Sequence, residues 1–326
     1  MRAAFIEQPG PPENIRYGEL PVPVPGPTDV LVDTLATTVN PVDTFVRSGL
    51  FPTPLPFPFV VGRDLVGTVT RVGPGACGFS VGDRVWTNSL GHGGRQGAAA
   101  ERSVVAADRL YPLPSGVPVE DAVAVVHPAA TARLALFTHG RLRAGETVWV
   151  AGAGGNVGSA MVVLAVDAGA RVLATAAARD LDHCRALGAA EAFDYRDPHL
   201  SARLAAACPS GVDLHLDTSG TNDLTSAVEL LAPRGRIVLL AGARARPVLP
   251  VGPLYMKDCS IVGFVISHAT TAELAEAATD INRLVATGRL RPRATEVLPL
   301  SATAETHARL ERGELHGRRV VLRPGD

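Results

Sequence analysis

The sequence Val148-Trp149-Val150-Ala151-Gly152-Ala153-Gly154-Gly155-Asn156-Val157-Gly158 decides the fold. It begins in an apolar run typical of a buried strand, and a segment rich in Ala, Val and Leu with helical periodicity follows at 155–169. A glycine-rich turn between a buried strand and a helix is the context that a dinucleotide-binding fingerprint requires. The alternative is a glycine-rich turn without a ligand, and the second strand–helix unit at 171–187 argues against it.

Three glycines of this turn have separate expected roles. Gly152 permits the tight turn, Gly155 lets the backbone approach a pyrophosphate, and Gly158 lets the helix lie close to the strand. The helix N-terminus adds unpaired N–H groups and partial positive charge for the anion. We therefore expect the cofactor to contact Gly152, Ala153, Gly155, Asn156, Val157 and Gly158.

The chain around this motif alternates between strand and helix patterns. Strand patterns occur at 147–151, 171–176, 192–195, 212–217 and 236–241, with helical patterns at 155–169, 180–187 and 224–231. Strands separated by helices of this length predict a parallel sheet with right-handed crossovers. The strands read as continuous apolar runs because such a sheet is buried on both faces.

The first 120 residues have a different texture. Short β-branched runs, for example 30–35 and 66–72, are punctuated by Pro and Gly and predict a small barrel-like domain. The prolines of 52–58 predict an irregular loop, because a proline cannot donate to a sheet ladder. From 294 the pattern returns to strand, helix (302–310) and strand (319–322), and we expect this tail to pack back on the first domain.

The strand that ends at Ala176 indicates the type of cofactor. An NAD site usually has an Asp or Glu at this tip, which binds the ribose 2′-OH. Here small residues, Ala176 to Ala178, precede Arg179, whose guanidinium can pair with a 2′-phosphate. Asp180 complicates this interpretation, although an acidic residue is also favoured at a helix N-terminus. We predict NADPH.

Composition excludes several other classes. The 326 residues suggest two domains, and the net charge of -1 gives no general positive field for nucleic acid or an anionic membrane. The first 16 residues contain no apolar core of a signal peptide, and no apolar run is long enough to span a bilayer. The four cysteines are scattered and form no CxxC pair, so we expect reduced thiols and a cytoplasmic protein.

Several short motifs together resemble the zinc-independent quinone oxidoreductase branch, similar to zeta-crystallin, of the medium-chain dehydrogenase/reductase superfamily. They are Val39-Asn40-Pro41-Val42-Asp43-Thr44, Gly62-Arg63-Asp64-Leu65-Val66-Gly67, Gly82-Asp83-Arg84-Val85, Ala107-Asp108-Arg109-Leu110, Leu187-Gly188-Ala189 and Phe193-Asp194-Tyr195-Arg196. The resemblance implies an α/β chain in which a GroES-like, mostly-β catalytic domain (1–122 and 267–326) flanks a Rossmann doubly wound parallel sheet (123–266). It also implies a cofactor cleft between the domains and a homodimer paired through an edge strand near 260–266.

The resemblance further assigns cofactor residues. Tyr195 matches the tyrosine that lies against the 2′-phosphate, whereas Leu181 stands where the family has a basic residue, and Arg179 compensates for that departure. The positions expected to line the rest of the cofactor are Thr131, Ser219, Ala241, Phe264 and Val265. For Phe264 and Val265 plain packing is an equally good interpretation.

The zinc ligands of related alcohol dehydrogenases are replaced. Asn40 and Arg63 occupy the first two ligand slots, and a guanidinium repels a cation. His127 falls near the third slot, where a hydrogen-bonded structural role is the alternative. One ligand of three cannot hold catalytic zinc, so we expect no metal.

Without a Lewis acid, the expected substrate is one that is already polarised: a quinone or an α,β-unsaturated carbonyl. Asn40 and Arg63 would stabilise the developing oxyanion, Asp43 would orient them, and His127 would deliver the second proton. The alternatives are that Asn40 caps a turn and that Arg63 only pairs with a carboxylate. Two other functions also stay open: an enoyl reductase of polyketide or secondary metabolism, and a non-catalytic NADPH-binding structural or RNA-binding protein.

Overall fold

The computed structural model describes residues 1–325, which form two compact units. Unit 1 comprises Met1–His127 and the chain from Thr270 onward, and unit 2 comprises Pro128–Ala269. The boundaries that we expected lie a few residues earlier, at 122/123 and 266/267. The observed boundary between His127 and Pro128 lies inside the continuous helix α2 (Val119–Arg133), so no break in the sequence pattern marks it.

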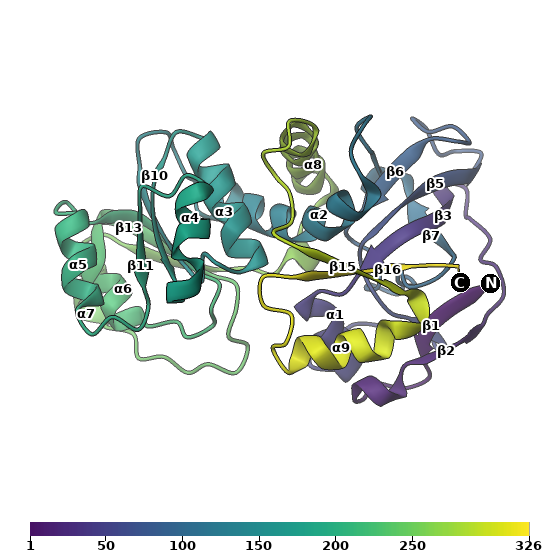
Figure 1. Cartoon of the computed structure of the whole chain (residues 1–326), viewed down its shortest axis with the longest axis horizontal. Coiled ribbons are helices and arrows are strands. Elements are labelled where there is room, and N and C mark those ends of the chain that lie inside the picture. The colour runs from purple at the N-terminus through teal and green to yellow at the C-terminus, as the bar shows by residue number, and fades with distance from the viewer. Residues whose placement is uncertain (326) are drawn as a thin grey trace. The chain divides into compact units, whose positions relative to one another are not determined.

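Unit 2 is built on a six-stranded parallel sheet (Figure 1). Its strands are β9 (Thr147–Ala151), β10 (Arg171–Ala176), β11 (Glu191–Asp194), β12 (Val212–Asp217), β13 (Leu231–Leu239) and β14 (Ser260–Gly263). The spatial order is β11-β10-β9-β12-β13-β14, with every neighbouring pair parallel. In chain order this is 3-2-1-4-5-6, the order of the doubly wound dinucleotide-binding fold. The predicted Rossmann sheet is confirmed.

Helices cover both faces of this sheet. They are α3 (Asn156–Asp167), α4 (Leu181–Ala186), α5 (Leu200–Ala207), α6 (Leu224–Leu230) and α7 (Val251–Met256). One core cluster unites Trp149, Leu173 and Ile237 of the sheet with Leu204 of α5 and Val228 of α6. Helices α5 and α6 therefore share a face, as the right-handed crossovers of this strand order require.

Unit 1 is mostly β, as predicted. A three-stranded sheet has the order β2-β1-β4, and a larger sheet runs β15-β16-β3-β5-β6-β8, with β7 paired to β3. The strands are β1 (Arg2–Ile6), β2 (Arg16–Glu19), β3 (Asp29–Thr38), β4 (Phe59–Val60), β5 (Leu65–Val72), β6 (Arg84–Thr87), β7 (Arg102–Ala106), β8 (Tyr111–Pro112), β15 (Thr295–Pro299) and β16 (Arg319–Arg323). The segment 52–58 contains no helix or strand, which confirms the expected irregular loop.

Both ends of the chain complete unit 1. The last strand, β16, pairs in parallel with β15 and antiparallel with β3, and the Thr38 hydroxyl donates to the Val320 carbonyl at 2.8 Å. Helix α9 (Thr303–Glu311) packs on α1 (Pro41–Ser48). The predicted return of the tail to the first domain is therefore confirmed.

In the part of the chain that the structure describes, five α-helices were not among our expectations: α1, α2, α5, α7 and α8 (Thr271–Ala286). Helix α1 begins directly after Asn40 with a proline in its first turn, a standard helix start that the surrounding β texture masked. Among residues 1–325, no helix is both long and apolar enough to cross a membrane.

Candidate active site and cofactor site

The glycine-rich turn of unit 2 has the geometry that its sequence predicted. Gly152 has φ +77°, and a Cβ there would lie 2.4 Å from the Thr218 hydroxyl oxygen. A Cβ at Gly158 would lie 2.3 Å from the Gly152 carbonyl oxygen, so only glycine lets α3 approach the turn. A Cβ at Gly155 would meet nothing nearer than 3.4 Å. Packing does not require a glycine there, and the open space fits a phosphate above the helix N-terminus.

The expected cofactor residues gather along one edge of the sheet. The turn Gly152–Gly155 follows β9, and Ala176, Tyr195, Ser219, Ala241 and Phe264 stand at or just after the carboxyl ends of β10, β11, β12, β13 and β14. Because the strands are parallel, their carboxyl ends meet at the same edge. In open α/β sheets, ligands bind in the crevice at this edge.

At the β10–β11 end, two arginines flank the expected 2′-phosphate position. The Arg179 side chain is 70% exposed, and the Arg196 guanidinium donates to the Tyr195 hydroxyl at 3.0 Å. Strands β10 and β11 are neighbours, with Ala176 opposite Asp194. Asp180, in contrast, is buried, and a Cβ at Gly154 would lie 2.9 Å from its carboxylate. The carboxylate that complicated the prediction thus packs under the turn.

Near the β12–β14 end, side-chain contacts shape the loops. The Asp217 carboxylate accepts hydrogen bonds from the N–H groups of Ser219 and Asn222 at 2.6 Å each. The Ala241 carbonyl accepts from the Asn222 amide at 3.0 Å, and Phe264 stacks on His139 with 4.4 Å between ring centroids. Phe264 therefore has a packing role. Thr131 and Val265 are half-buried in the same unit.

In unit 1 the structure brings together the four predicted catalytic residues. Asn40 precedes α1, Asp43 is in its first turn, Arg63 follows β4, and His127 lies in α2. Two further charged side chains complete this polar cluster, Asp64 and Arg319. All six side chains are buried. A carboxylate pair and a guanidinium pair balance each other's charge, as buried charges require.

Asn40 links the members of the polar cluster. Its amide nitrogen donates to Asp64 Oδ2 at 2.7 Å, and its amide oxygen accepts from Arg319 Nη2 at 2.9 Å. Its backbone N–H donates to Asp43 Oδ2 at 2.7 Å, which completes the cap of α1. Asn40 is therefore both a helix cap, one of its two expected roles, and a member of the polar cluster.

Burial controls the charges of the polar cluster. It raises the pKa of Asp43 to about 6, and the nearby Asp64 raises it further against the opposing effect of Arg63. Burial also lowers the pKa of Arg63 and of Arg319, while the two carboxylates oppose that change. Burial thus moves the pKa of the Asp43 carboxyl group toward neutral pH.

Arg63 has unused hydrogen-bonding capacity. Its side chain is 1% exposed, its Nε lies 4.0 Å from Asp43 Oδ1, and Nε and Nη2 have no hydrogen-bond partner among the described residues. The same holds for buried oxygens of Thr87, Asn88 and Ser89, on the segment whose Leu90 N–H donates to the Arg63 carbonyl. Buried polar atoms without partners are rare in folded proteins, and in a functional site they mark the place of a ligand.

Within residues 1–325, no group of three His, Cys, Asp or Glu side chains is placed to hold a metal ion. His127 Nδ1 faces Asp64 Oδ1 at 3.1 Å and the Asn88 carbonyl at 3.3 Å.

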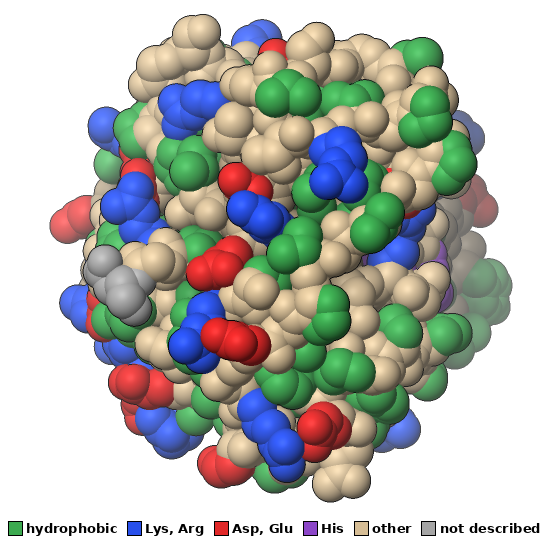
Figure 2. Space-filling model, turned by 90° about the vertical axis from the view of Figure 1, so that its right-hand side faces the viewer, with side chains coloured by type: hydrophobic (Ala, Val, Ile, Leu, Met, Phe, Trp, Pro, Cys, Tyr) green, Lys and Arg blue, Asp and Glu red, His purple; other side chains and the backbone are tan. Residues whose placement is uncertain are grey.

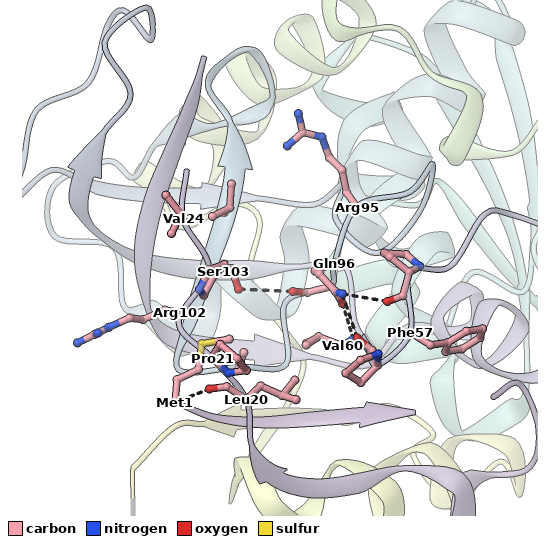
Figure 3. Close-up of a pocket in the computed structure, with 16 residues that line it drawn as sticks. Met1, Leu20, Pro21, Val24, Phe57, Val60, Arg95, Gln96, Arg102 and Ser103 are labelled. Carbon is pink, nitrogen blue, oxygen red and sulfur yellow. Dashed lines mark hydrogen bonds between the residues drawn. The ribbon is translucent and has the colours of Figure 1, made fainter. Parts of the chain in front are cut away.

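A cavity of about 400 Å³ in unit 1 is separate from this chemistry (Figure 3). It lies among Leu20, Val24, Phe57 and Val60, and its wall contains no member of the polar cluster. Gln96 in its wall is fully engaged, accepting from the Val60 N–H and donating to two proline carbonyls. The cavity therefore offers apolar surface and little free hydrogen-bonding capacity.

Two members of the polar cluster escaped the sequence analysis as site residues. Asp64 stands beside Arg63 in the Gly62–Gly67 motif, and in the structure it lies against Asn40 and His127. Arg319 is 279 residues from Asn40 in sequence, and no motif pointed to it.

Known proteins are similar to this chain over almost its whole length. Residues 156–282 match the family model described as zinc-binding dehydrogenase, and residues 26–115 match the alcohol dehydrogenase GroES-like domain. The quinone oxidoreductase of Mus musculus is 31% identical over 99% of this chain and 97% of its own.

Solved structures with the same fold also match almost the whole chain. A structure described as an NAD-dependent alcohol dehydrogenase is 34% identical, with a TM-score of 0.89 and full coverage of both chains. The mycobacterial protein Rv1454c, solved in complex with NADPH, is 28% identical, with a TM-score of 0.86 over 99% of this chain and 100% of its own. With its GroES-like and Rossmann units and its nucleotide fingerprint, the chain belongs to the quinone oxidoreductase family, similar to zeta-crystallin, of the medium-chain dehydrogenase/reductase superfamily.

Proposed function

We propose that this oxidoreductase uses NADPH to reduce quinones or α,β-unsaturated carbonyl compounds without zinc. The observation that carries the proposal is the buried Arg63 guanidinium, whose Nε and Nη2 have no hydrogen-bond partner among the described residues. Such a cation is suited to an oxygen atom that gains negative charge during the reaction. Quinones and enones place negative charge on an oxygen when they accept hydride.

The residues of unit 1 then have distinct tasks. When bound, NADPH supplies the hydride. Arg63 stabilises the oxyanion that develops on the substrate, and Asn40 fixes the first turn of α1 beside it. Asp43 orients this region through the Asn40 N–H and holds its charge near Arg63. His127 transfers the second proton to the substrate.

Zinc independence rests on the chemistry of the donor set. Asn40 and Arg63 stand at two positions where zinc-dependent relatives have a zinc ligand. The Asn40 side chain is hydrogen-bonded to Asp64 and Arg319, and the Arg63 guanidinium is a cation that would repel a metal ion. Metal analysis of the purified protein tests this proposal, and zinc at one atom per chain would contradict it.

We propose that Arg179 and Tyr195 make the protein prefer NADPH over NADH by contacting the 2′-phosphate. The mycobacterial relative solved in complex with NADPH supports this proposal. We expect Arg179→Ala to weaken NADPH binding roughly tenfold or more and NADH binding little, because the exposed guanidinium, whose Nε lies 4.0 Å from the Asp180 carboxylate, would pair with the 2′-phosphate that NADH lacks. Titration of both nucleotides against nicotinamide fluorescence measures the two affinities. Because another relative is described as NAD-dependent, the opposite preference is also testable. An equal loss of affinity for both nucleotides in the variant, or tighter binding of NADH than of NADPH by the wild type, would contradict the proposal.

Arg63 is tested by turnover. We expect Arg63→Ala to lower kcat/KM on a quinone or an enone by roughly 10²-fold, the usual cost of losing one oxyanion donor, while NADPH affinity stays unchanged. A panel of quinones, enones and enoyl thioesters with NADPH identifies the substrate class, and preference for an enoyl thioester would support an enoyl reductase of polyketide or secondary metabolism. An unchanged rate in the variant would remove Arg63 from the mechanism.

The second candidate is a non-catalytic NADPH-binding protein with a structural or RNA-binding role. On the face in Figure 2, blue and red side chains alternate instead of gathering by sign, so that face offers no basic patch for RNA. Tight NADPH binding without turnover on any member of the panel would favour this candidate over the enzyme.

We also propose a cytoplasmic homodimer. Strand β14 is at the edge of the unit 2 sheet, and the exposed apolar side chains of Val248, Val251, Tyr255 and Met256 lie on the segment just before it. An apolar edge of this kind needs a cover, and a second copy supplies one by continuing the sheet. A monomer in analytical ultracentrifugation would contradict the dimer. Among the described residues no disulfide occurs, which suits a reducing compartment.

A further inference from the structure

The ring nitrogen Nδ1 of His127 is surrounded by hydrogen-bond acceptors. Asp64 Oδ1 lies 3.1 Å from it, and the Asn88 carbonyl oxygen lies 3.3 Å from it. The Asp64 side chain is fully buried, and Oδ1 makes no regular hydrogen bond with any described residue, so its 3.1 Å approach to the ring is an ion-pair contact. A carboxylate and a backbone carbonyl can only accept, so the hydrogen of a neutral His127 ring belongs on Nδ1.

A chain of hydrogen bonds fixes the orientation of Asp64. Its other oxygen, Oδ2, accepts from the Asn40 amide nitrogen at 2.7 Å. The Asn40 amide cannot turn over, because its oxygen accepts at 2.9 Å from Arg319, which has donors only. Donor and acceptor are therefore assigned for both hydrogen bonds, from Arg319 to Asn40 and from Asn40 to Asp64 Oδ2. The other Asp64 oxygen, Oδ1, lies 3.1 Å from His127 Nδ1.

We propose that Asp64 is a positioning residue that holds the Nδ1–H of His127, so that the imidazolium form of the ring releases its proton to the substrate from Nε2 and the neutral ring that remains keeps its hydrogen on Nδ1. The inference rests on the proposed function, in which His127 transfers the second proton. A carboxylate that holds an imidazole in one tautomer performs this task in hydrolytic triads, and there its amide variant is nearly inactive because the tautomer is wrong.

The other charged groups near His127 have separate partners. Asp43 accepts from the Asn40 N–H and faces Arg63, and Arg63 Nε points toward Asp43 at 4.0 Å. Asp64 is therefore the carboxylate at hydrogen-bond distance from the ring. The variant Asp64→Asn is informative because the Asn40 amide still requires an acceptor at Oδ2. The new NH₂ group would then face Nδ1, a donor against a donor.

The direct test is nitrogen NMR on the full-length protein with ¹⁵N-labelled histidine, with His127 assigned by the loss of its signals in His127→Gln. We expect the wild type to carry the hydrogen on Nδ1 and Asp64→Asn to shift Nδ1 toward the unprotonated frequency. His215 serves as the internal control, because its Nδ1 lies 3.2 Å from the Trp149 carbonyl in the other unit and should not change. A wild-type ring protonated on Nε2, or an Nδ1 signal unmoved in Asp64→Asn, would overturn the proposal.

Turnover separates this inference from the proposed function. We expect Asp64→Asn to lower kcat with a quinone or enone by roughly 10²-fold or more, with NADPH affinity unchanged. If the wild type binds NADPH but reduces no member of the panel, the proposed function fails. The NMR measurement still decides whether Asp64 fixes the tautomer of His127, because it does not depend on turnover. If the wild type turns over and Asp64→Asn keeps its full rate, the function stands and the positioning role fails.

Discussion

Replacing Gly158 with alanine is expected to disrupt the nucleotide site of unit 2. The added Cβ would lie 2.3 Å from the Gly152 carbonyl oxygen and 2.7 Å from the Ala153 Cα, and neither backbone atom can rotate away. Helix α3 must shift from the turn, at a cost of about 1–3 kcal/mol of stability. Because the same helix N-terminus binds the pyrophosphate, NADPH affinity should fall at least about tenfold. Urea unfolding and nucleotide titration measure the two effects.

Two further alanine variants separate packing from binding. Gly155→Ala has space for its Cβ within the protein, so it should fold like the wild type and still bind NADPH more weakly, because the methyl group occupies the position of the phosphate. Gly18→Ala controls for the general effect of replacing glycine, since its Cβ would make an ordinary 3.6 Å contact with Phe5 in unit 1. Wild-type NADPH affinity in both Gly155→Ala and Gly158→Ala would refute the location of the pyrophosphate.

Acid is expected to destabilise unit 1 through His307. This side chain of α9 is fully buried, and neither ring nitrogen has a hydrogen-bond partner among the described residues. Burial and the neighbouring Arg47 lower the pKa of His307 to about 3. The folded state therefore binds fewer protons than the unfolded chain, so its stability is greatest above pH 6.5 and falls as the pH decreases toward the folded pKa. Between pH 6.5 and pH 4 this single group should remove about 3 kcal/mol.

Two variants of His307 isolate this effect. His307→Leu and His307→Gln differ in polarity but share the loss of the titrating ring, so both should lose about 3 kcal/mol less than the wild type between pH 6.5 and pH 4. Denaturant unfolding of unit 1, followed at each pH, gives the slopes. Parallel slopes for the wild type and both variants would mean that the buried ring is not the cause.

The parts of the molecule that could be predicted are those specified by local patterns. The turn at Gly152–Gly158 and the alternating strands of unit 2 depend on neighbours in sequence, and both appear as expected. Of the expected cofactor residues, Ala176, Tyr195, Ser219, Ala241 and Phe264 stand at or just after the ends of these strands, whereas Thr131, which the resemblance suggested, lies in α2. Helix α1 was missed because Pro and Gly surround it, although its start at Asn40 carries a standard cap.

The side-chain partners of the active site could not be predicted. Asn40, Arg63 and His127 were chosen for their chemistry, but their burial and their direct partners depend on long-range packing. Arg319 reaches Asn40 only because β16 pairs with β3, a contact between the two ends of the chain. The buried position of Asp180 likewise depends on the close approach of Gly154, which a single sequence does not reveal.

The pairing of the last strand with an early one has a consequence for biosynthesis. Unit 2 is a continuous segment, so all of its strands have left the ribosome while the C-terminal strand of unit 1 has yet to be translated. Until Arg319 is translated, the Asn40 amide oxygen lacks its donor, and the carboxylates of Asp43 and Asp64 lack one of their two neighbouring guanidinium groups. A nascent chain that stops before residue 319 would therefore contain all the strands of unit 2, whereas unit 1 would lack the strand that pairs with β3 and β15.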